Sequence, residues 1–280
     1  MQTAVYSNGV WQESCSREAD LGLHRNEGGV EVLVAKGDVP FHWYDHHSRL
    51  RGSCGYYGIS LEKLLPGQKI LEQIKLMLSR EGCERGQIHV LVTSGDSEDL
   101  KTPSSSPRLS LNIWPFFQGN PPPLSVMPVN ERRIVPRHKL TFHYGNVGPN
   151  LKKAKEAGFD SFLYSDEKDG LLEGPYENLF FVNDAGELIT PAFGALPGVT
   201  RRILLNLAQK SGLRVLEQPV RLWHLRRMKE AFFSSTTKGA AAISKVGEYE
   251  HFEVGERTLT AQLKKLFFEY QERYYSERGA

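Results

Sequence analysis

The chain has few cysteines, and no pattern joins them. Among its 280 residues are three cysteines, Cys15, Cys54 and Cys83, which are far apart and odd in number. Scattered cysteines of odd number do not make a disulfide framework and are typical of a reducing compartment, so we expect buried or surface thiols. No Cys-x-x-Cys pair occurs, and we predict no metal site.

Long apolar runs are absent as well. No stretch approaches the roughly 20 apolar residues that a membrane helix requires, so we expect no membrane span. Residues 1–6 lack the basic and then apolar segments of a signal peptide. We therefore predict a cytoplasmic location.

No charge of one sign dominates. Lys and Arg number 35 against 33 Asp and Glu, which gives a formal net charge of +2, and the Arg-Arg pairs are too short to form a basic stripe. We therefore expect no nucleic-acid partner. The 40% hydrophobic and 24% charged fractions are those of an ordinary globular protein, and the length allows one large or two medium domains.

The first 117 residues predict a small α+β domain with an antiparallel sheet. Apolar residues at helical spacing favour a helix over residues 67–81, and another is expected over residues 45–57. The expected strands, which are short and bounded by turn residues, cover residues 4–6, 30–35, 40–43, 88–93 and 109–114.

Three consecutive prolines, Pro121, Pro122 and Pro123, exclude helix and central strand because proline fixes φ and lacks a donor. We place an interdomain linker at residues 118–123, before a larger domain at residues 124–280. The strands expected there cover residues 124–129, 161–165, 179–182, 187–190, 215–220 and 231–234, and the helices cover residues 150–157, 200–211 and 259–275.

Residues 172–202 combine two unusual features. Glu173 precedes a glycine turn that leads into a β-hairpin, whose own turn is Asn-Asp-Ala-Gly at residues 183–186. Pro197 and Gly198 then end the extended segment, and Thr200 lies where a helix start offers free backbone N–H groups to an anion. A carboxylate close to an anion-binding helix start suits a phosphorylated cofactor with a basic ring nitrogen.

Lys139 is a candidate nucleophile. It lies between Val-Pro-Arg-His and Leu-Thr-Phe-His-Tyr, a mixed apolar, cationic and aromatic setting. Desolvation and neighbouring cations lower the pKa of a lysine and make it a usable amine nucleophile. A lysine considered alone is more often a solvated surface residue.

The order of Arg49, Lys139, Tyr144, Glu173, Thr200 and Thr236 resembles that of the class IV aminotransferases. These are fold type IV pyridoxal phosphate (PLP) enzymes, and they include branched-chain and D-amino-acid aminotransferases and 4-amino-4-deoxychorismate lyase. The likeness covers almost the whole chain and is strongest over residues 139–238. It implies a two-domain α+β fold, with a small α/β sandwich domain and a larger pseudo-barrel domain, and a homodimer as the active unit.

The resemblance implies roles for three residues of the first motifs. The family pattern H-x-x-R-L-x-x-S is matched by residues 46–53, which places Arg49 on the cofactor phosphate. The Schiff-base lysine of the family falls on Lys139. Tyr144, five residues later, falls where the family binds the phenolic oxygen of the cofactor.

The later motifs imply the remaining cofactor contacts. E-G-x-x-x-N-hydrophobic-F matches residues 173–180, and Glu173 then pairs with the pyridine nitrogen. L-P-G-x-T-R matches residues 196–201 and places the amides of Val199 and Thr200 on the phosphate. Ser235 and Thr236, in S-S-T-T-K-G, form a second phosphate anchor.

Each motif has a structural alternative when it is considered alone. Glu-Gly is an ordinary turn, Thr200 is an N-cap, and Arg49 is a surface cation on a helix. Only their joint order is specific. Lys238 is a competing lysine beside the phosphate threonines, and we interpret it as a rim cation or a surface residue because the family places its Schiff base elsewhere.

The chain departs from the family where substrates are chosen. Branched-chain enzymes carry Y-x-R-P, whereas this chain has Gln-Ile-His-Val at residues 87–90, and the common T-R-G is Thr-Ser-Gly at residues 93–95. Arg25 is a candidate for the missing carboxylate-binding arginine, because a guanidinium binds carboxylate with two donors. A loop salt bridge is the equal alternative. His89 either lines the pocket or is a packed histidine.

The resemblance favours a PLP-dependent aminotransferase that exchanges an amino group between a small amino acid and a 2-oxo acid. The missing arginines favour a D-amino-acid or broad-range enzyme over a typical branched-chain one. Two alternatives stay open. One is a lyase of the 4-amino-4-deoxychorismate type, which releases pyruvate, and the other is a non-catalytic relative that serves as a binding protein.

Overall fold

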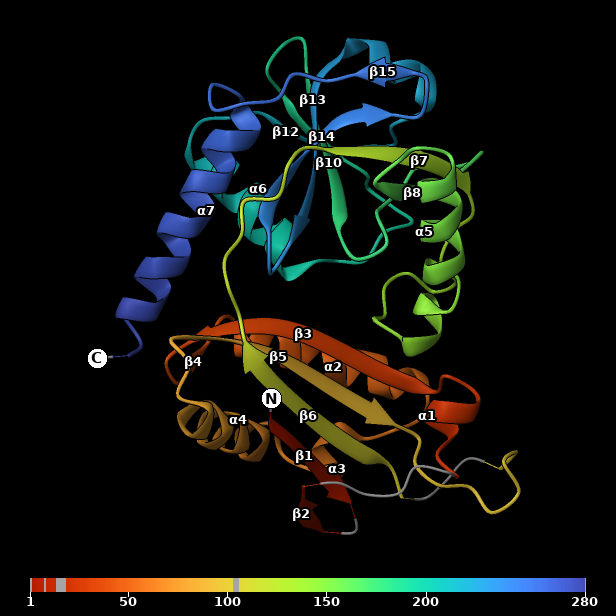
Figure 1. The fold of residues 1–280 in the computed structure, drawn as a ribbon, viewed down its shortest axis with the longest axis vertical. Helices are drawn as coiled ribbons and strands as arrows, with labels where there is room; N and C mark the ends of the chain where they lie inside the picture. The colour runs from red at the N-terminus through yellow and green to blue at the C-terminus, as the bar shows by residue number, and fades with distance from the viewer. Residues whose placement is uncertain (1, 8, 14–18, 103–105, 280) are drawn as a thin grey trace. The chain divides into compact units, whose positions relative to one another are not determined.

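A computed structural model describes residues 2–7, 9–13, 19–102 and 106–279 of the chain. It separates into two compact units (Figure 1). The first comprises residues 1–117, 138–145 and 273–280, and the second comprises residues 118–137 and 146–272. Both contain helices and strands, which confirms the predicted α+β class. The finer division into residues 1–117, 118–123 and 124–280 stays a prediction.

The first unit is built on a six-stranded antiparallel sheet in the order β2-β1-β6-β5-β3-β4. Its strands are β1 (Gln2–Ser7), β2 (Val10–Gln12), β3 (Gly28–Lys36), β4 (Val39–Pro40), β5 (Arg85–Thr93) and β6 (Arg108–Pro115). Side chains alternate between the two faces of a strand. Ile88 and Val90 of β5 lie in the core, so Gln87 and His89 lie on the opposite face.

Helices cover the core face of this sheet. They are α2 (Trp43–Tyr56), α3 (Leu61–Leu64) and α4 (Gly67–Glu81), and the short helix α1 (Leu21–His24) precedes β3. Helix α4 has the predicted bounds, and its Ile70 and Ile74 are fully buried in the same core as Leu50 of α2.

The strand expected over residues 40–43 is wrong. Strand β4 ends at Pro40, and α2 begins at Trp43. His42 has a positive φ of 53°, a left-handed conformation that no strand continues through. The apolar side chain of Phe41 is buried without belonging to a strand. Burial alone therefore produced the strand-like pattern.

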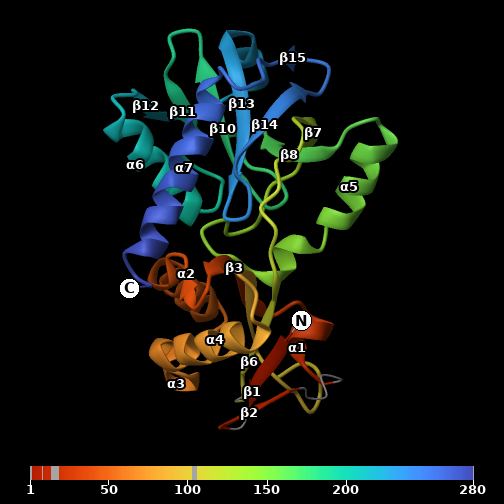
Figure 2. The ribbon, with the colours of Figure 1, turned by 60° about the vertical axis from the view of Figure 1, so that its left-hand side comes forward.

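The second unit contains a nine-stranded mixed sheet in the order β12-β11-β10-β13-β14-β7-β8-β9, with β15 also paired to β14 (Figure 2). Its strands are β7 (Leu124–Asn130), β8 (Ser161–Asp166), β9 (Gly170–Leu171), β10 (Asn178–Asn183), β11 (Leu188–Thr190), β12 (Val215–Glu217), β13 (Met228–Ser235), β14 (Gly239–Val246) and β15 (Glu250–His251). Its helices are α5 (Val147–Glu156), α6 (Val199–Lys210) and most of α7 (Leu259–Ser276). Two 3-10 helices, η1 (Thr141–Tyr144) in the first unit and η2 (Leu222–Arg227) in the second, complete the fold.

Aromatic side chains fill both faces of the central strands in this unit. Phe181 and Phe233 belong to the buried core on one face. Phe180 and Phe232 stack on the other face, with ring centroids 4.8 Å apart. Helix α6 packs against β13. The predicted hairpin turn is confirmed, since Gly186 has a φ of 76° and Asn183 Oδ1 accepts hydrogen bonds from the backbone within the turn.

Strand β14 was not predicted. Its first half is the run Ala240 to Ala242, and alanine favours helix over strand. The run is extended because it pairs along its length with β13, where Ala242 faces Phe232 and Ala240 faces Ser234. The expected strand over residues 215–220 is also shorter, since β12 ends at Glu217.

The described cysteines are thiols, as expected from their number and spacing. Cys54 is buried and Cys83 is half-buried, and both are free, whereas Cys15 lies outside the described residues. Burial raises the pKa of the Cys54 thiol to about 12. In the described part of the chain no helix is both long and apolar enough to span a membrane.

Candidate active site

The backbone of Lys139 is fixed at the edge of the first unit's sheet. Its carbonyl accepts a hydrogen bond from Val30 N of β3 at 3.0 Å. Its N–H donates to Ser53 Oγ of α2 at 2.9 Å, and the next residue, Leu140, forms a bridge with Gly29. The candidate nucleophile is thus carried on a rigid sheet edge, although it follows the proline-rich linker in sequence.

The side chain of Lys139 lies against Tyr144, the residue that the resemblance assigns to the phenolic oxygen of the cofactor. Lys139 Nζ donates to Tyr144 Oη at 2.6 Å and lies 5.3 Å from the ring centroid. The short helix η1 places the tyrosine five residues after the lysine and turns it back toward it. The hydroxyl therefore orients the amine, which is a requirement for a positioned nucleophile.

Arg49 is held by a buried carboxylate on β3. Its Nε and Nη2 donate to the two oxygens of Glu31 at 2.6 and 2.7 Å, and His46 Nδ1 lies 2.7 Å from Glu31 Oε2. Burial works to raise the pKa of Glu31, but Arg49 and His46 outweigh it and lower that pKa to about 2. Burial lowers the pKa of His46. The bidentate pair fixes the guanidinium that the resemblance assigns to the phosphate.

The spacing of His42 and His46, one helical turn apart, is also found in metal sites. Here their Nδ1 atoms face different carboxylates, Asp45 and Glu31. The described residues contain no group of three or more His, Cys, Asp or Glu side chains arranged to hold a metal ion.

The two predicted substrate residues have different surroundings. Arg25 is 45% exposed, its Nε lies 3.1 Å from Glu27 Oε1, and its Nη1 donates to the carbonyl of Lys101 at 2.8 Å. These contacts are those of the loop salt bridge that sequence left open. His89 Nε2 lies 2.8 Å from Gln87 Nε2, and its ring centroid is 4.5 Å from that of Trp114.

The surroundings of His89 lower its pKa. Burial lowers the pKa of His89, and the positive charge of Lys139 lowers it further. The imidazole is therefore neutral at pH 7. Gln87 then donates to His89 Nε2, which leaves the imidazole proton on Nδ1.

In the second unit, Glu173 is almost fully buried beside an arginine that sequence reasoning missed. Arg133 Nη1 lies 3.2 Å from Glu173 Oε1, and both side chains are at most 5% exposed. Arg133 also donates to the carbonyl of Pro175 and lies over the Tyr164 ring, 5.3 Å from its centroid. Arg133 follows another arginine in a segment that matched no motif, so only its burial in the fold reveals it.

Residues 173–177, which we call the Glu173 turn, are joined to the segment before α6. Leu196 N donates to Glu173 Oε2 at 2.9 Å, and Asn178 Nδ2 donates to the Leu196 carbonyl at 2.7 Å. Within the turn, Gly174 N donates to the Glu177 carbonyl at 2.8 Å. The glutamate and the asparagine of the E-G-x-x-x-N motif therefore hold both backbone groups of one residue, Leu196.

The predicted phosphate residues meet at the start of α6. The helix begins at Val199 after the N-cap Gly198, and Thr200 Oγ1 lies 3.4 Å from Thr236 Oγ1. Ser235 ends β13 beside them. A helix N-terminus with two threonine hydroxyls is a suitable donor set for a phosphate dianion. These residues, together with the buried carboxylate of Glu173, fit the two ends of PLP.

Lys238, the competing lysine, is paired. Its Nζ donates to Glu177 Oε1 at 2.6 Å. The contact links the turn after β13 to the Glu173 turn.

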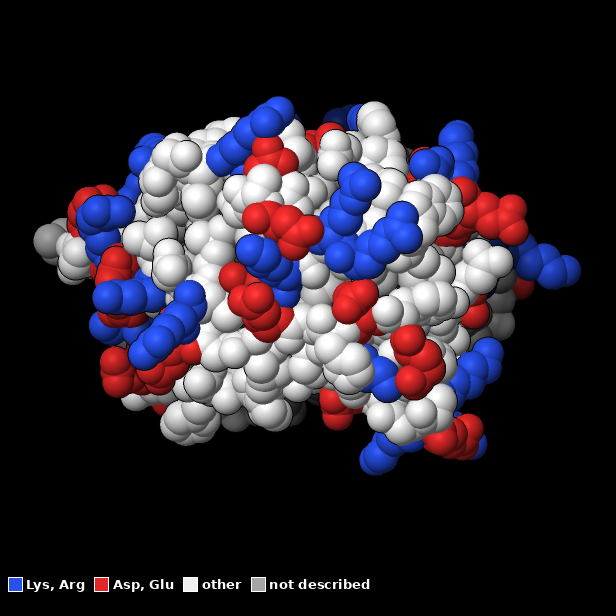
Figure 3. Space-filling model, turned by 90° about the horizontal axis from the view of Figure 1, so that it is seen from above, with Lys and Arg blue, Asp and Glu red and all other residues white. Residues whose placement is uncertain are grey.

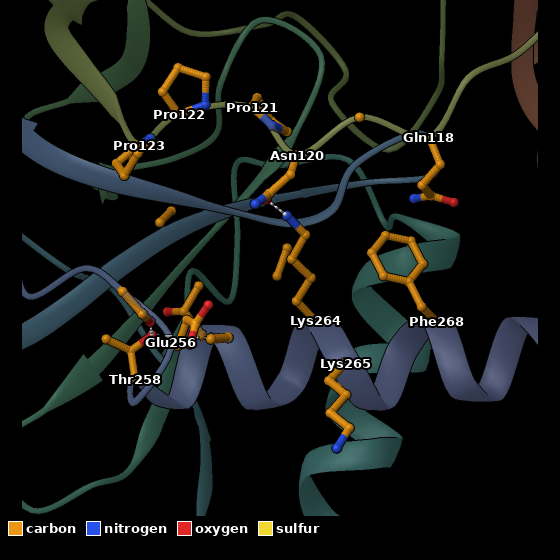
Figure 4. Close-up of a pocket in the computed structure, with 16 residues that line it drawn as sticks. Gln118, Asn120, Pro121, Pro122, Pro123, Glu256, Thr258, Lys264, Lys265 and Phe268 are labelled. Atoms are coloured by element: carbon orange, nitrogen blue, oxygen red, sulfur yellow. Dashed lines mark hydrogen bonds between the residues drawn. The ribbon is translucent and has the colours of Figure 1, made fainter.

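A cavity of about 580 Å³ lies elsewhere in the second unit, between the segment 118–123 and α7 (Figure 4). Lys264 Nζ donates across it to Asn120 Oδ1 at 2.6 Å, and burial lowers the pKa of Lys264. None of the predicted cofactor residues lines this cavity. On the face shown in Figure 3, basic and acidic side chains are interspersed.

Comparison with known proteins places these residues in a family. Residues 28–246 match the model of the family described as amino-transferase class IV. A putative branched-chain-amino-acid aminotransferase of Methanocaldococcus jannaschii is 33% identical over 283 residues, which cover 94% of each chain.

Two solved structures share the fold. An aminotransferase from Brucella abortus, bound to the cofactor PLP, has a TM-score of 0.82 at 20% identity and covers 97% of this chain and 100% of its own. A putative 4-amino-4-deoxychorismate lyase from Legionella pneumophila has a TM-score of 0.81 at 21% identity, with 93% and 96% covered. Because a family model matches most of the sequence, the chain belongs to the class IV aminotransferases, a family of PLP-dependent enzymes.

Proposed function

We propose that this protein is a transaminase that exchanges an amino group between a small amino acid with an uncharged side chain and a 2-oxo acid. The amino acid is a D-amino acid or a branched-chain one within a broad range. The observation that carries the proposal is the Lys139 amine, held 2.6 Å from Tyr144 Oη on a backbone fixed to β3 and α2.

Lys139 acts as the nucleophile and as the proton carrier. PLP, when bound, supplies the carbonyl that condenses with amines and the ring that accepts electron density from the substrate Cα. The Lys139 amine would hold the cofactor through that carbonyl and, once free, would accept the proton from the substrate Cα. Tyr144 orients the amine and donates to the phenolic oxygen of the cofactor.

The second unit supplies the groups for the other end of the cofactor. Glu173, whose carboxylate is paired with the guanidinium of Arg133 at 3.2 Å, would contact the pyridine nitrogen and keep a proton there. The phosphate is held by the amides of Val199 and Thr200 and by the hydroxyls of Ser235 and Thr236. Arg49, oriented by Glu31, is the phosphate residue contributed by the first unit.

The preference for uncharged side chains is supported by the wall around His89. Gln87, His89 and Trp114 lie together on β5 and β6, and none carries a charge at pH 7 because the pKa of His89 is lowered. A substrate carboxylate buried against these three side chains would lose its hydration without gaining a cation from them, which is unfavourable. Neutral side chains incur no such penalty.

The first experiment tests the nucleophile. Holoenzyme reduced with borohydride is expected to carry the cofactor on the peptide that contains Lys139, as measured by mass spectrometry. Lys139→Ala is expected to lose both the reducible adduct and transamination, whereas Lys155→Ala, on the exposed side of α5, keeps both. A reducible adduct that persists in Lys139→Ala contradicts the assignment.

The second experiment tests the substrate class. L- and D-amino acids and (R)-amines are screened with pyruvate and 2-oxoglutarate as acceptors, and the isosteric pairs glutamine with glutamate and asparagine with aspartate are compared directly. We expect kcat/KM to be higher for the neutral member of each pair. His89→Arg is expected to reverse that order, because it adds a cation to the wall.

A lyase is the second candidate, and the similarity in fold to the Legionella protein supports testing it. Pyruvate release from 4-amino-4-deoxychorismate is measured beside transamination. Release without amino transfer would replace the proposed reaction by elimination. We also propose a homodimer, in line with the family resemblance, which light scattering of the purified protein tests.

A further inference from the structure

The turn between β13 and β14 carries both a predicted phosphate residue and Lys238. Ser235 pairs with Gly239 across the hairpin, and Lys238 N donates to the Ser235 carbonyl at 3.3 Å, so the turn is tight. Thr236 lies in the same turn, two residues before the lysine. The backbones of Lys238 and Thr236 are therefore held in one short turn.

The partner of Lys238 lies inside the Glu173 turn. Glu177 is 6% exposed, and its Oε1 accepts from Lys238 Nζ at 2.6 Å. Its Oε2 accepts from Tyr176 N at 3.1 Å, and its carbonyl accepts from Gly174 N. The Glu177 carboxylate thus accepts a backbone hydrogen bond within the turn, and the same carboxylate binds Lys238.

Three contacts join the cofactor segments of the second unit pairwise. The Glu173 turn binds the segment before α6 through Leu196. The start of α6 meets the β13–β14 turn through Thr200 and Thr236. The Lys238–Glu177 pair joins the β13–β14 turn to the Glu173 turn through side chains, next to the backbone pairing of Asn178 with Ser234.

We propose that Lys238 is a positioning residue for the cofactor, which acts by fixing Thr236 at the phosphate end relative to Glu173 at the ring end. The inference rests on the cofactor roles assigned under the proposed function. The Lys238 side chain is 37% exposed and that of Glu177 is 4% exposed, so the pair is more shielded than surface ion pairs, which contribute little. Lys238 does not itself bind the cofactor.

The test is a double-mutant cycle on the affinity for PLP. Dissociation constants are measured by absorbance titration of apoenzyme for the wild type, Lys238→Met, Glu177→Gln and the double variant. Each single variant is expected to weaken PLP binding about tenfold, in line with the loss of a partly buried ion pair. The double variant is expected to match the single ones, because both changes remove the same contact.

Two controls accompany the cycle. Lys245→Met removes an ion pair with Glu248 at 2.9 Å, farther along β14, and is expected to leave the affinity unchanged. Lys238→Arg keeps the charge and is expected to restore most of the affinity. If Glu177→Gln does not fold, Glu177→Asp takes its place in the cycle, because it shortens the side chain that reaches Lys238 and keeps the charge of the turn.

Two results would overturn the proposal. If Lys238→Met weakens PLP binding equally in the Glu177→Gln background, Lys238 contacts the phosphate directly. If the variants lower the thermal midpoint of the apoenzyme but leave the affinity for PLP unchanged, the pair is only structural. Because no substrate is present, these outcomes are distinct from a failure of transamination, which would refute the proposed reaction and leave this inference standing.

Discussion

Each unit of the protein buries a carboxylate beside an arginine, yet the two sites differ in what else they contact. In the first unit, Glu31 receives hydrogen bonds from Arg49 and His46, which are side chains of α2. In the second unit, Glu173 lies near Arg133 and accepts the backbone N–H of Leu196. The Glu31 cluster joins a helix to a sheet and orients Arg49 through side chains, whereas Glu173 joins two backbone segments of the proposed cofactor site.

The contacts of a buried carboxylate indicate whether it mainly stabilises the fold or mainly positions a site. A carboxylate enclosed by side chains of a helix and a strand contributes mainly to stability, because its loss leaves their charges unbalanced. A carboxylate that holds the backbone just before an anion-binding helix start contributes mainly to the geometry of a site. Variants of Glu31, Glu173 and Gly198 test whether stability and site geometry separate in this way.

Glu31→Gln has the largest expected effect. Removing one partner of a buried ion pair leaves the Arg49 guanidinium uncompensated, so we expect the free energy of unfolding to fall by about 3–5 kcal/mol. Denaturant unfolding followed by tryptophan fluorescence measures the loss, since Trp43 is buried on the same helix. Glu72→Gln, in an exposed pair with Lys69, is the control and is expected to change nothing measurable. A loss below about 1 kcal/mol would contradict a structural role for Glu31.

Glu173→Gln is expected to act on catalysis. The amide cannot stabilise a proton on the pyridine nitrogen, and loss of one preorganised electrostatic contact lowers kcat by about 100- to 1000-fold. The Gln side chain still accepts from Leu196 N, and Arg133 keeps its hydrogen bond to the carbonyl of Pro175, so we expect stability to fall less than in Glu31→Gln. Steady-state rates and unfolding curves are measured for both variants. If Glu173→Gln loses stability but keeps kcat, the comparison between the two carboxylates fails.

Much of the fold followed from the sequence where local pattern and tertiary position agree. Residues 67–81 form α4 as predicted, because Ile70 and Ile74 recur at helical spacing and both reach the core. Strand β14 escaped prediction because the Ala240 to Ala242 run has no strand preference and is extended only through its pairing with β13. Propensity cannot report a partner that lies outside the local window.

In the candidate site, contacts between residues close in sequence could be predicted and contacts between distant residues could not. The contact of Lys139 with Tyr144 was predictable because one short helix turn separates them. The contact of Arg133 with Glu173 was not, since it joins residues distant in sequence and depends on the burial of an arginine, which is rare.

The free energy of unfolding is expected to depend on pH through Glu31 and His46 in the first unit. The pKa of Glu31 is lowered from 4.5 to about 2, so the unfolded chain takes up the proton first. The stabilisation is complete above pH 4.5 and is lost as the pH falls through 2, by at most about 3 kcal/mol. The lowered pKa of His46 acts in the same direction, with stability falling as the pH drops below 6.5.

Unfolding curves at pH 7, 5.5, 4 and 3 measure this loss. The wild type is expected to lose stability at each step, and Glu31→Gln is expected to give a flatter profile below pH 4.5 because the titrating carboxylate is gone. Parallel profiles for the two proteins would show that other groups govern the acid response.

Gly198→Ala is expected to have the smallest effect and tests the second unit alone. Gly198 has a φ of −68° and a ψ of 139°, which alanine adopts without strain. Its Cβ would clash with Asn178 Oδ1, so Asn178 must move and its hydrogen bond to the Leu196 carbonyl is lost. We expect a loss of about 1–3 kcal/mol in stability and weaker PLP binding, measured by unfolding and by absorbance titration.

Gly148→Ala is the matched control, because Gly148 lies exposed in α5 with open space around its Cβ. Alanine there is expected to be neutral or stabilising by about 0.5–1 kcal/mol. Equal effects of the two substitutions would mean that the Asn178–Leu196 contact does not hold α6 in place. A loss of PLP affinity confined to Gly198→Ala would instead show that the Glu173 turn positions the phosphate end of the site through backbone contacts, a role that Glu31 does not have in the first unit.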